Sequence, residues 1–227
     1  MSRIDDLIAQ YAPDGVEYRA LRDVGTWVGG VTPSKAVARY WENGTIPWVA
    51  SMDISATQGS QIRGRITQDA LDETSLRVIS GPTVAVVMRS NVLRKFLPIG
   101  YIAVDTTVNQ DIRLLTPHSD VDTRYAFWAL QSASERIRRA GIVRTDGSMA
   151  AVDSQGLLDW RIPVPPLEVQ REIVRILDAF TELEAELEAE LEAELEARRA
   201  QYAHYRDALL SFTERERERE SQVGHVE

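Results

Sequence analysis

One apolar stripe at helical spacing runs through the last third of the chain. Leucines recur at every fourth position from Leu183 to Leu195, within four consecutive Glu-Leu-Glu-Ala units that span Glu182–Ala197. Ala, Leu and Glu all favour helices, and no Gly or Pro interrupts them. Apolar residues continue the stripe on both sides of the repeat, at Ile173, Ile176, Leu177 and Phe180 before it and at Tyr202, Tyr205, Leu209 and Phe212 after it. The pattern predicts one helix over residues 167–212, about 70 Å long.

A helix of this length cannot bury its stripe on a small domain, so the pattern also predicts a second helix as a partner. The Glu residues repel one another at i,i+4, so burial of the leucines must stabilise the helix. An ordinary solvated acidic helix is the alternative. The leucine period of four drifts by about 40° per unit, which argues against a strict heptad coil in the repeat. The residues expected at the dimer contact are Ile173, Leu177, Phe180, Leu183, Leu187, Leu191 and Leu195.

The first two thirds of the chain predict a mixed domain. Runs rich in β-branched residues at 83–88, 99–104 and 110–115 are typical of strands. Residues 124–140 predict a helix with Phe127, Leu130 and Ile137 on one side, and residues 1–11 predict a short helix. The stiff run Ile162-Pro-Val-Pro-Pro166 leads directly into the long helix and marks a boundary. We therefore expect an α+β fold, with a helical lead-in over 1–20, a domain over 21–166, the long helix over 167–212 and a charged, disordered tail over 213–227.

Composition and charge refine this division. The chain has 227 residues, 44% of them hydrophobic, and no cysteine, which excludes disulfides and cysteine-ligated metals. The net charge of -9 is unevenly distributed, because residues 1–166 hold 18 Lys+Arg and 18 Asp+Glu, while residues 167–227 hold 8 and 17. The first domain is neutral and can present a basic face to an acidic partner. The sequence lacks a signal core and an apolar run of membrane-spanning length, so we expect a cytoplasmic protein.

The motifs of common catalytic sites are missing. The sequence has no Gly-Lys pair of a phosphate-binding loop, no His-Glu-x-x-His and no Gly-x-Ser-x-Gly, and its three histidines are scattered. It also lacks the Asn/Asp-Pro-Pro-aromatic tetrad of amino-methyltransferases, and neither lysine follows the acidic pair of a metal-dependent nuclease. We expect no catalytic residues, no metal and no cofactor in this chain.

Polar loops that follow predicted strands favour contact with nucleic acid. Arg, Asn and Gln read base edges, whereas Ser, Thr and Lys hold phosphates. For Asn109 and Gln110 an alternative to DNA contact is equally plausible. They could form a buried pair whose side chains make hydrogen bonds to backbone groups. The candidate DNA-binding residues are Arg63, Arg65, Arg89, Asn91, Arg94, Lys95, Thr107, Asn109, Gln110, Arg144 and Ser148.

In this order, several motifs resemble the specificity subunit of type I restriction–modification systems, and more specifically one half of such a subunit. They cover nearly the whole chain up to Phe212. Tetrapeptide repeats in the spacer helix are a further feature of that family. The motifs are Asp14–Tyr18 with Leu21 and Val24, Gly29–Pro33 with Tyr40-Trp41 and Ile46–Val49, Thr107–Gln110, Ile162–Gln170, and the far end of the helix at Ala197–Tyr202 and Tyr205–Phe212.

The resemblance implies a non-catalytic subunit that recognises double-stranded DNA and docks a DNA methyltransferase subunit, through which restriction subunits join. S-adenosylmethionine would then be bound by the methyltransferase partner. A full-length subunit of that family has two target-recognition domains joined by two antiparallel helices, and this chain carries one of each. The resemblance therefore implies either two copies paired through an antiparallel coiled coil or a truncated product. From the residues alone, a coiled-coil adaptor or inhibitor without DNA contact stays open, and a methyltransferase or nuclease subunit is disfavoured by the missing motifs.

Overall fold

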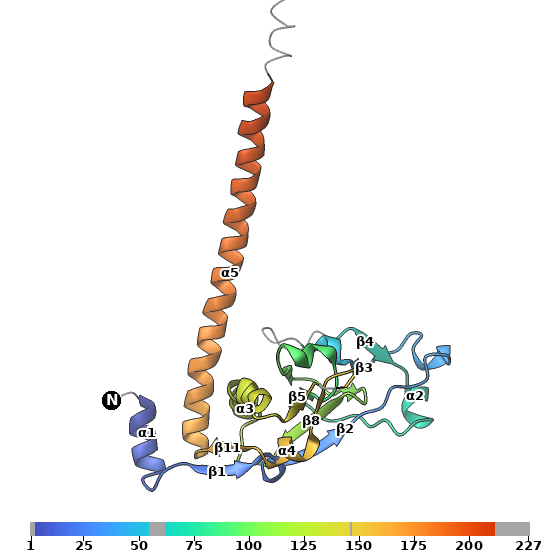
Figure 1. The fold of residues 1–227 in the computed structure, drawn as a ribbon, viewed down its shortest axis with the longest axis vertical. Coiled ribbons are helices and arrows are strands. Elements are labelled where there is room, and N and C mark those ends of the chain that lie inside the picture. Colours follow the sequence, from blue (N-terminus) through green and yellow to red (C-terminus); the bar gives the residue numbers. More distant parts are fainter. Residues whose placement is uncertain (1–2, 55–61, 146, 212–227) are drawn as a thin grey trace, which may run out of the picture. The chain divides into compact units, whose positions relative to one another are not determined.

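The computed structural model describes residues 3–54, 62–145 and 147–211. It divides into two compact units, Met1–Ile176 and Leu177–Glu227. The first contains all the described strands, and the second consists, in its described part, mainly of the long helix α5 (Leu167–Leu210), which begins in the first unit (Figure 1). The α+β class is confirmed, as is a helix over nearly the predicted range, while its pairing with another helix stays a prediction. Phe212, at the end of the predicted helix, and the tail lie outside the described residues.

The centre of the first unit is an antiparallel sheet in the order β2-β8-β5-β6. Three of its strands match the predicted runs. The fourth, which was not predicted, ends at Gly29, the first residue of the Gly29–Pro33 motif. The strands are β2 (Gly25–Gly29), β5 (Thr83–Val87), β6 (Ile99–Ile102) and β8 (Ile112–Pro117). Every residue of β5 is buried, because Val84 and Val86 face one apolar cluster while Ala85 and Val87 face another. A nearly continuous run of apolar and β-branched residues is typical of a strand covered on both faces.

Helix α3 (Thr123–Arg139) covers one face of this sheet and confirms the predicted helix. Asp122 caps its first turn, since its carboxylate accepts a hydrogen bond from the Tyr125 amide at 2.9 Å. The Tyr125 hydroxyl donates to the Pro163 carbonyl at 2.8 Å, and burial raises the pKa of this phenol to about 12. The helix is thereby fastened to β11 (Arg161–Val164), the strand that leads into α5.

A second, three-stranded sheet has the order β4-β3-β7. Strand β3 (Ile46–Val49) pairs antiparallel with β4 (Gly64–Ile66) and parallel with β7 (Thr107–Val108). A separate apolar cluster around Trp48 supports this sheet, with the Trp41 ring edge-on to Trp48 at a centroid distance of 5.0 Å. Helix α2 (Gln68–Asp72) and the short 3-10 helices η2 (Ala38–Tyr40) and η3 (Ser51–Asp53) flank it in sequence.

The lead-in is helical only in its first half. Helix α1 spans Arg3–Tyr11, but residues Glu17–Ala20 form a strand, β1, that pairs antiparallel with β11. The prediction of a helical segment over residues 1–20 was therefore wrong for its second half, because the pairing that makes β1 a strand comes from residues 161–164. The remaining elements are η1 (Leu21–Asp23), η4 (Asn91–Arg94), a small hairpin of β9 (Val143–Arg144) and β10 (Ala151–Val152), and helix α4 (Ser154–Asp159).

The start of α5 is anchored by the side chain of Gln170, which is fully buried. Its amide nitrogen donates to the Pro165 carbonyl at 2.6 Å and to the Asp120 carbonyl at 3.0 Å. Its carbonyl oxygen accepts a hydrogen bond from the Asp122 amide at 2.8 Å. One carboxamide thus joins the first turn of α5, the end of β11 and the loop before α3.

Replacing Gln170 should therefore cost more stability than its single side chain suggests. Gln170→Leu leaves a buried donor and two buried acceptors without partners, at about 1–3 kcal/mol for each unsatisfied group. Gln170→Glu keeps the shape but turns an acceptor toward two carbonyls, so we expect it to destabilise as well. The free energy of unfolding of both variants is measured by urea titration, followed by a signal that reports the tertiary structure of the first unit. Glu168→Ala, two residues earlier at an exposed position, is the control and should leave the midpoint unchanged.

The Gly29-Gly30 pair contains one glycine that the fold requires and one that it does not. The Val31 amide donates to the Val108 carbonyl at 3.0 Å, which brings the chain against β7. A Cβ on Gly30 would lie 1.8 Å from that carbonyl oxygen, whereas a Cβ on Gly29 would meet nothing within 4 Å. The close approach of two backbones explains the glycine at position 30.

Gly30→Ala should accordingly disrupt the junction between β2 and β7. A methyl group cannot occupy a position 1.8 Å from a backbone oxygen, so the chain must move. Thermal unfolding should show a loss of several kcal/mol, at the upper end of single substitutions. Gly29→Ala is the matched control, and a comparable loss in both variants would contradict the steric explanation.

Candidate nucleic-acid interface

Three polar segments that are far apart in sequence meet beside the end of β5 and the start of β8. Arg89, just after β5, donates from Nε to Asp111 Oδ1 at 2.8 Å, just before β8. The Ser90 amide donates to the Ala150 carbonyl at 3.0 Å, and Arg89 forms an isolated bridge with Ala151. We call residues 89–95, 109–111, 144–145 and 147–150 the loop cluster. The predicted site residues in these segments therefore do come together in space.

Arg94 fastens two of these segments. Its Nη1 donates to the Thr145 carbonyl at 2.7 Å, and its Nη2 donates to the Gly147 carbonyl at 2.8 Å. The side chain comes from η4, whose first turn is capped by the Ser90 hydroxyl accepting from the Val92 amide at 3.3 Å. Carbonyl partners orient a guanidinium without cancelling its charge. Arg94 therefore holds Thr145 and Gly147 in place and still presents a positive charge.

Arg89 is oriented differently, by a carboxylate. Asp111 is itself fixed, because its amide donates to Asn109 Oδ1 at 3.1 Å and its carbonyl accepts from the Met88 amide at 2.7 Å. The Arg89 side chain remains 53% exposed, so the ion pair adds little stability and serves to aim the guanidinium. A similar pair joins Arg144 to Asp153 at 3.4 Å.

Most of the predicted DNA-binding residues are exposed, but two are not. Thr107 and Asn109 are buried, and the Thr107 hydroxyl donates to the Pro47 carbonyl at 2.9 Å. The Asn109 amide donates to the Val49 carbonyl, which continues the pairing of β7 with β3. The alternative of a buried pair was given for Asn109 and Gln110, and the structure buries Asn109 but leaves Gln110 exposed. Thr107 is buried as well, because the parallel pairing of β7 with β3 draws it into the protein. The exposed members are Arg63, Arg65, Arg89, Asn91, Arg94, Lys95, Gln110, Arg144 and Ser148.

Arg63 and Arg65 belong to a different sheet from the loop cluster. They flank Gly64 on β4, and Arg63 Nε lies 3.7 Å from the buried carboxylate of Asp53. Asp53 also accepts a hydrogen bond from the Ala50 amide at 2.9 Å. The segment 55–61 before β4 lies outside the described residues. These two arginines stay candidates in their own right, on a sheet separate from the loop cluster.

Asp111 and Thr32 contact the predicted site residues but were not predicted as part of the site. Asp111 links Arg89 to the Asn109 turn, and the Thr32 hydroxyl donates to Gln110 Oε1 at 2.5 Å. Thr32 stands in the Gly29–Pro33 motif, more than 70 residues before its partner. Asp111 could have been predicted as a site residue because it directly follows Asn109-Gln110 in the sequence. Thr32 could not, because only the fold brings it next to Gln110.

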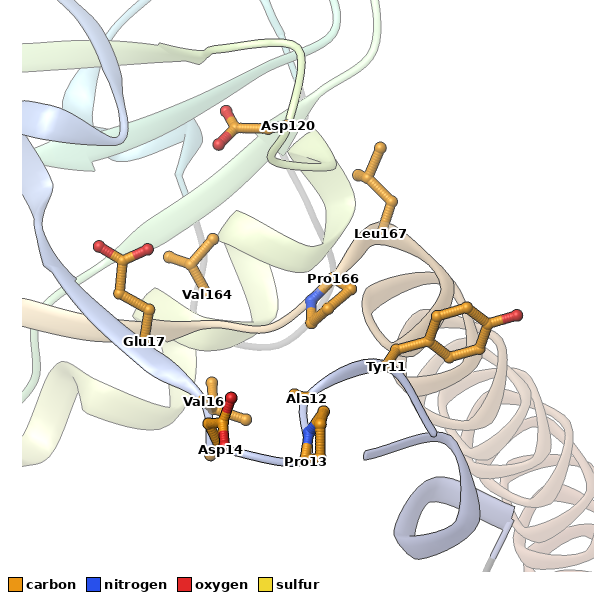
Figure 2. Close-up of a pocket in the computed structure, with 11 residues that line it drawn as sticks. Tyr11, Ala12, Pro13, Asp14, Val16, Glu17, Asp120, Val164, Pro166 and Leu167 are labelled. Atoms are coloured by element: carbon orange, nitrogen blue, oxygen red, sulfur yellow. The ribbon is translucent and has the colours of Figure 1, made fainter. Parts of the chain in front are cut away.

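A hollow of about 430 Å³ lies elsewhere in the first unit, along the turn that follows α1 (Figure 2). The carboxylates of Asp14, Glu17 and Asp120 lie around it, together with Val164 and Leu167. Asp120 is already paired with Arg19 at 2.8 Å. Among the residues that the structure describes, no group of His, Cys, Asp and Glu has the arrangement of a metal site. Within the same residues, no helix combines the length and the apolar character of a membrane span.

The predicted dimerisation residues are mostly uncovered in the single chain. Ile173 packs against the core of the first unit, and Leu177 is partly buried. The others are exposed, with 62% of Phe180, 53% of Leu183, 59% of Leu187, 71% of Leu191 and 50% of Leu195 accessible.

Comparison with known proteins assigns the family. A family model described as the Type I restriction modification DNA specificity domain matches residues 13–197. The chain belongs to this family. The relatives that it matches are named type I restriction enzyme specificity subunits.

Two curated relatives come from Escherichia coli. The chain is 37% identical over 207 residues to the type I restriction enzyme EcoR124I/EcoR124II specificity subunit, which covers 91% of the chain and 51% of the relative. It is 34% identical over 226 residues to the EcoprrI specificity subunit, covering 88% and 51%. The chain thus spans about half the length of the curated relatives it matches.

Solved structures support the fold. A chain from a structure of the type I R-M system aligns with a TM-score of 0.66 at 20% identity, covering 90% of this chain and 50% of that one. The HsdS subunit from Thermoanaerobacter tengcongensis aligns with a TM-score of 0.57 at 18% identity, covering 82% and 44%. At this identity the likeness establishes the architecture alone.

We predict that arginines of the loop cluster read bases. Arg89→Ala or Arg94→Ala should weaken binding to a selected duplex by about 1–3 kcal/mol if the guanidinium contacts guanine bidentately. A contact to phosphate would instead weaken all duplexes alike. Binding is measured on duplexes selected from a random pool, with the methyltransferase partner present.

Two variants control this experiment. Arg22→Ala removes the same charge next to the opposite end of the sheet, where Arg22 pairs with Asp159. Arg94→Lys keeps the charge but loses the fork that binds two carbonyls, so it separates loop support from charge. Unchanged binding in Arg89→Ala and Arg94→Ala, with the fold intact, would show that the assignment is wrong.

Proposed function

We propose that this chain is a non-catalytic DNA-recognition subunit that reads one half of a bipartite site and docks a methyltransferase subunit. The observation that carries the proposal is the loop cluster, in which exposed arginine and amide side chains stand on a buried sheet and are oriented by named partners. Side chains held in place lose little freedom on binding, which favours specific contacts over transient ones. Restriction subunits would join through the methyltransferase, and S-adenosylmethionine would be bound by that partner.

The charge distribution supports the same division of labour. The glutamate repeat of α5 cannot lie along a phosphate backbone, because like charges repel. The first unit is neutral in sum, and its described loop cluster holds Arg89, Arg94, Lys95 and Arg144. We infer that DNA contact falls to the first unit, while α5 acts as a spacer and as the surface through which two copies associate.

A coiled-coil adaptor without DNA contact is the second candidate, favoured only by the exposed stripe of α5. Duplex DNA separates the two. A recognition subunit should bind in the presence of the methyltransferase, with an affinity that falls as salt rises because condensed counterions are released. An adaptor should show no salt-dependent shift.

The spacer role makes a further prediction about the four repeat units. Removing one unit shortens each helix by about 6 Å and should bring the two recognition domains closer together. Since DNA rises about 3.4 Å per base pair, the gap between the half-sites should shorten by one or two base pairs while both half-site sequences stay the same. Mapping of methylated sites for complexes with three, four and five units measures the gap. An unchanged gap across the series would show that the repeat is packing filler.

A further inference from the structure

A short exposed turn at residues 34–36 is held at its base by two tryptophan side chains. The Trp48 indole donates to the Val31 carbonyl at 3.1 Å, and the Trp41 indole donates to the Ser34 carbonyl at 3.1 Å. The two rings pack edge-on in the apolar cluster around Trp48. The turn is therefore fixed to the fold although its own residues are exposed.

One side chain ties this turn to the loop cluster. The Thr32 hydroxyl donates to Gln110 Oε1 at 2.5 Å. Gln110 directly precedes Asp111, whose carboxylate orients Arg89. Lys35 follows Thr32 by three residues, and three residues of chain span at most about 11 Å. The turn therefore lies beside the arginine and amide side chains of the loop cluster.

The turn presents the groups with which proteins hold phosphate. Lysines, serine hydroxyls and backbone amides all donate to phosphate oxygens. Residues 34–36 combine the Lys35 ammonium, the Ser34 hydroxyl and the amides of consecutive residues. In the described part of the chain, none of these donors has a hydrogen-bond acceptor or an acidic partner. A fixed, exposed set of unpaired donors beside a positive charge is suited to an anion.

The distribution of the lysines points to the same surface. Of the 26 lysines and arginines in the chain, only Lys35 and Lys95 are lysines. Lys95 belongs to the loop cluster, and the turn adjoins that cluster through Thr32. A lysine ammonium binds phosphate as a compact point charge, whereas the arginine fork matches the two acceptors of a guanine edge. Both kinds of contact are therefore available on one surface.

We propose that the turn at residues 34–36 binds a phosphate of the DNA backbone and thereby sets the register of the loop cluster on the duplex. This inference deepens the DNA recognition proposed above and rests on it. Lys35 neutralises the phosphate, while the Ser34 hydroxyl and the turn amides donate to its oxygens. Phosphate contacts position a protein on DNA, and base contacts specify the sequence. The turn supplies the first, and Arg89 with its neighbours supplies the second.

The short distance between the turn and the loop cluster limits which phosphate is bound. A span of about 11 Å corresponds to about three base pairs of duplex at 3.4 Å each. The bound phosphate therefore lies within about four base pairs of the base that Arg89 contacts, once the reach of the Lys35 side chain is added.

The salt dependence of binding tests the charge at position 35. Each phosphate contact on B-DNA contributes about 0.9 to the slope of log K against log salt concentration. Lys35→Ala should reduce the steepness by about that amount and weaken binding to every duplex by about threefold to fivefold. Lys35→Arg should keep both the affinity and the slope. Binding is measured with the full chain and the methyltransferase partner, on the selected duplex and on an unrelated one.

The outcomes separate this inference from the function on which it rests. If the unaltered chain binds the selected duplex and Lys35→Ala leaves affinity and slope unchanged, only the turn assignment is wrong. If the unaltered chain shows no salt-dependent binding to any duplex, DNA recognition fails and the inference fails with it. If Lys35→Ala disrupts the complex with the methyltransferase in the absence of DNA, the turn binds protein and the proposal is overturned.

Replacing single phosphates locates the contact on the DNA. Each phosphate of the selected duplex is exchanged in turn for an uncharged methylphosphonate. One or two positions within about four base pairs of the base read by Arg89 should weaken binding of the unaltered chain, and Lys35→Ala should be insensitive to them. Arg22→Ala is the control and should remain sensitive at the same positions. Equal sensitivity of Lys35→Ala and the unaltered chain at every position would refute the contact.

The tryptophan support is tested by Trp41→Phe, which removes the donor to the Ser34 carbonyl and keeps an aromatic ring. The turn then gains freedom that binding must remove, so affinity should fall by about twofold to fivefold. The salt slope should stay the same because no charge is lost. Unchanged affinity in a folded Trp41→Phe variant would show that the indole does not hold the turn for binding.

Discussion

The first unit depends on a single buried carboxamide. Gln170 presents a donor group and an acceptor from one short side chain, and its three partners are main-chain groups at Asp120, Asp122 and Pro165. A carboxylate lacks the donors and an apolar side chain lacks both kinds of group. Because Asp122 also caps α3 and Pro165 ends the β11 segment, the sheet's covering helix and the start of α5 share one point of attachment.

The candidate interface uses a different physical device. Leu93 and Ala150 anchor two of its segments in the apolar core, and hydrogen bonds from arginines hold the exposed parts. Arg94 donates to two carbonyls, which leave its positive charge uncompensated. Arg89 is oriented by the Asp111 carboxylate, which partly neutralises its charge. The cluster therefore combines a fixed geometry with an incompletely neutralised positive charge. That combination suits a surface that must distinguish base edges rather than merely attract phosphate.

The sequence pattern predicted the helices and strands that form from their own residues, without depending on which distant segment pairs with them. The β-branched run at Thr83–Val87, the amphipathic helix at residues 123–139 and the long helix were all visible in the sequence. Strand β1 was not, because Glu-Tyr-Arg-Ala has little strand character and becomes a strand only against residues 161–164. The burial of Thr107 and Asn109 was not predicted for the same reason, since it follows from pairing with β3, about 60 residues earlier.

The repeat shows how far a simple pattern can be interpreted without its flanks. Considered alone, a leucine at every fourth position turns steadily around a helix and gives no continuous contact surface. The flanking residues change this, because Phe180 and Tyr202 return the stripe to the direction of Leu191 from both sides. The repeat then needs to bridge only the stretch between Phe180 and Tyr202, over which its leucines drift by about 40° per unit. A repeat that is unsuited to a long coil is thus compatible with a short helix–helix contact, such as the association of two copies proposed for α5.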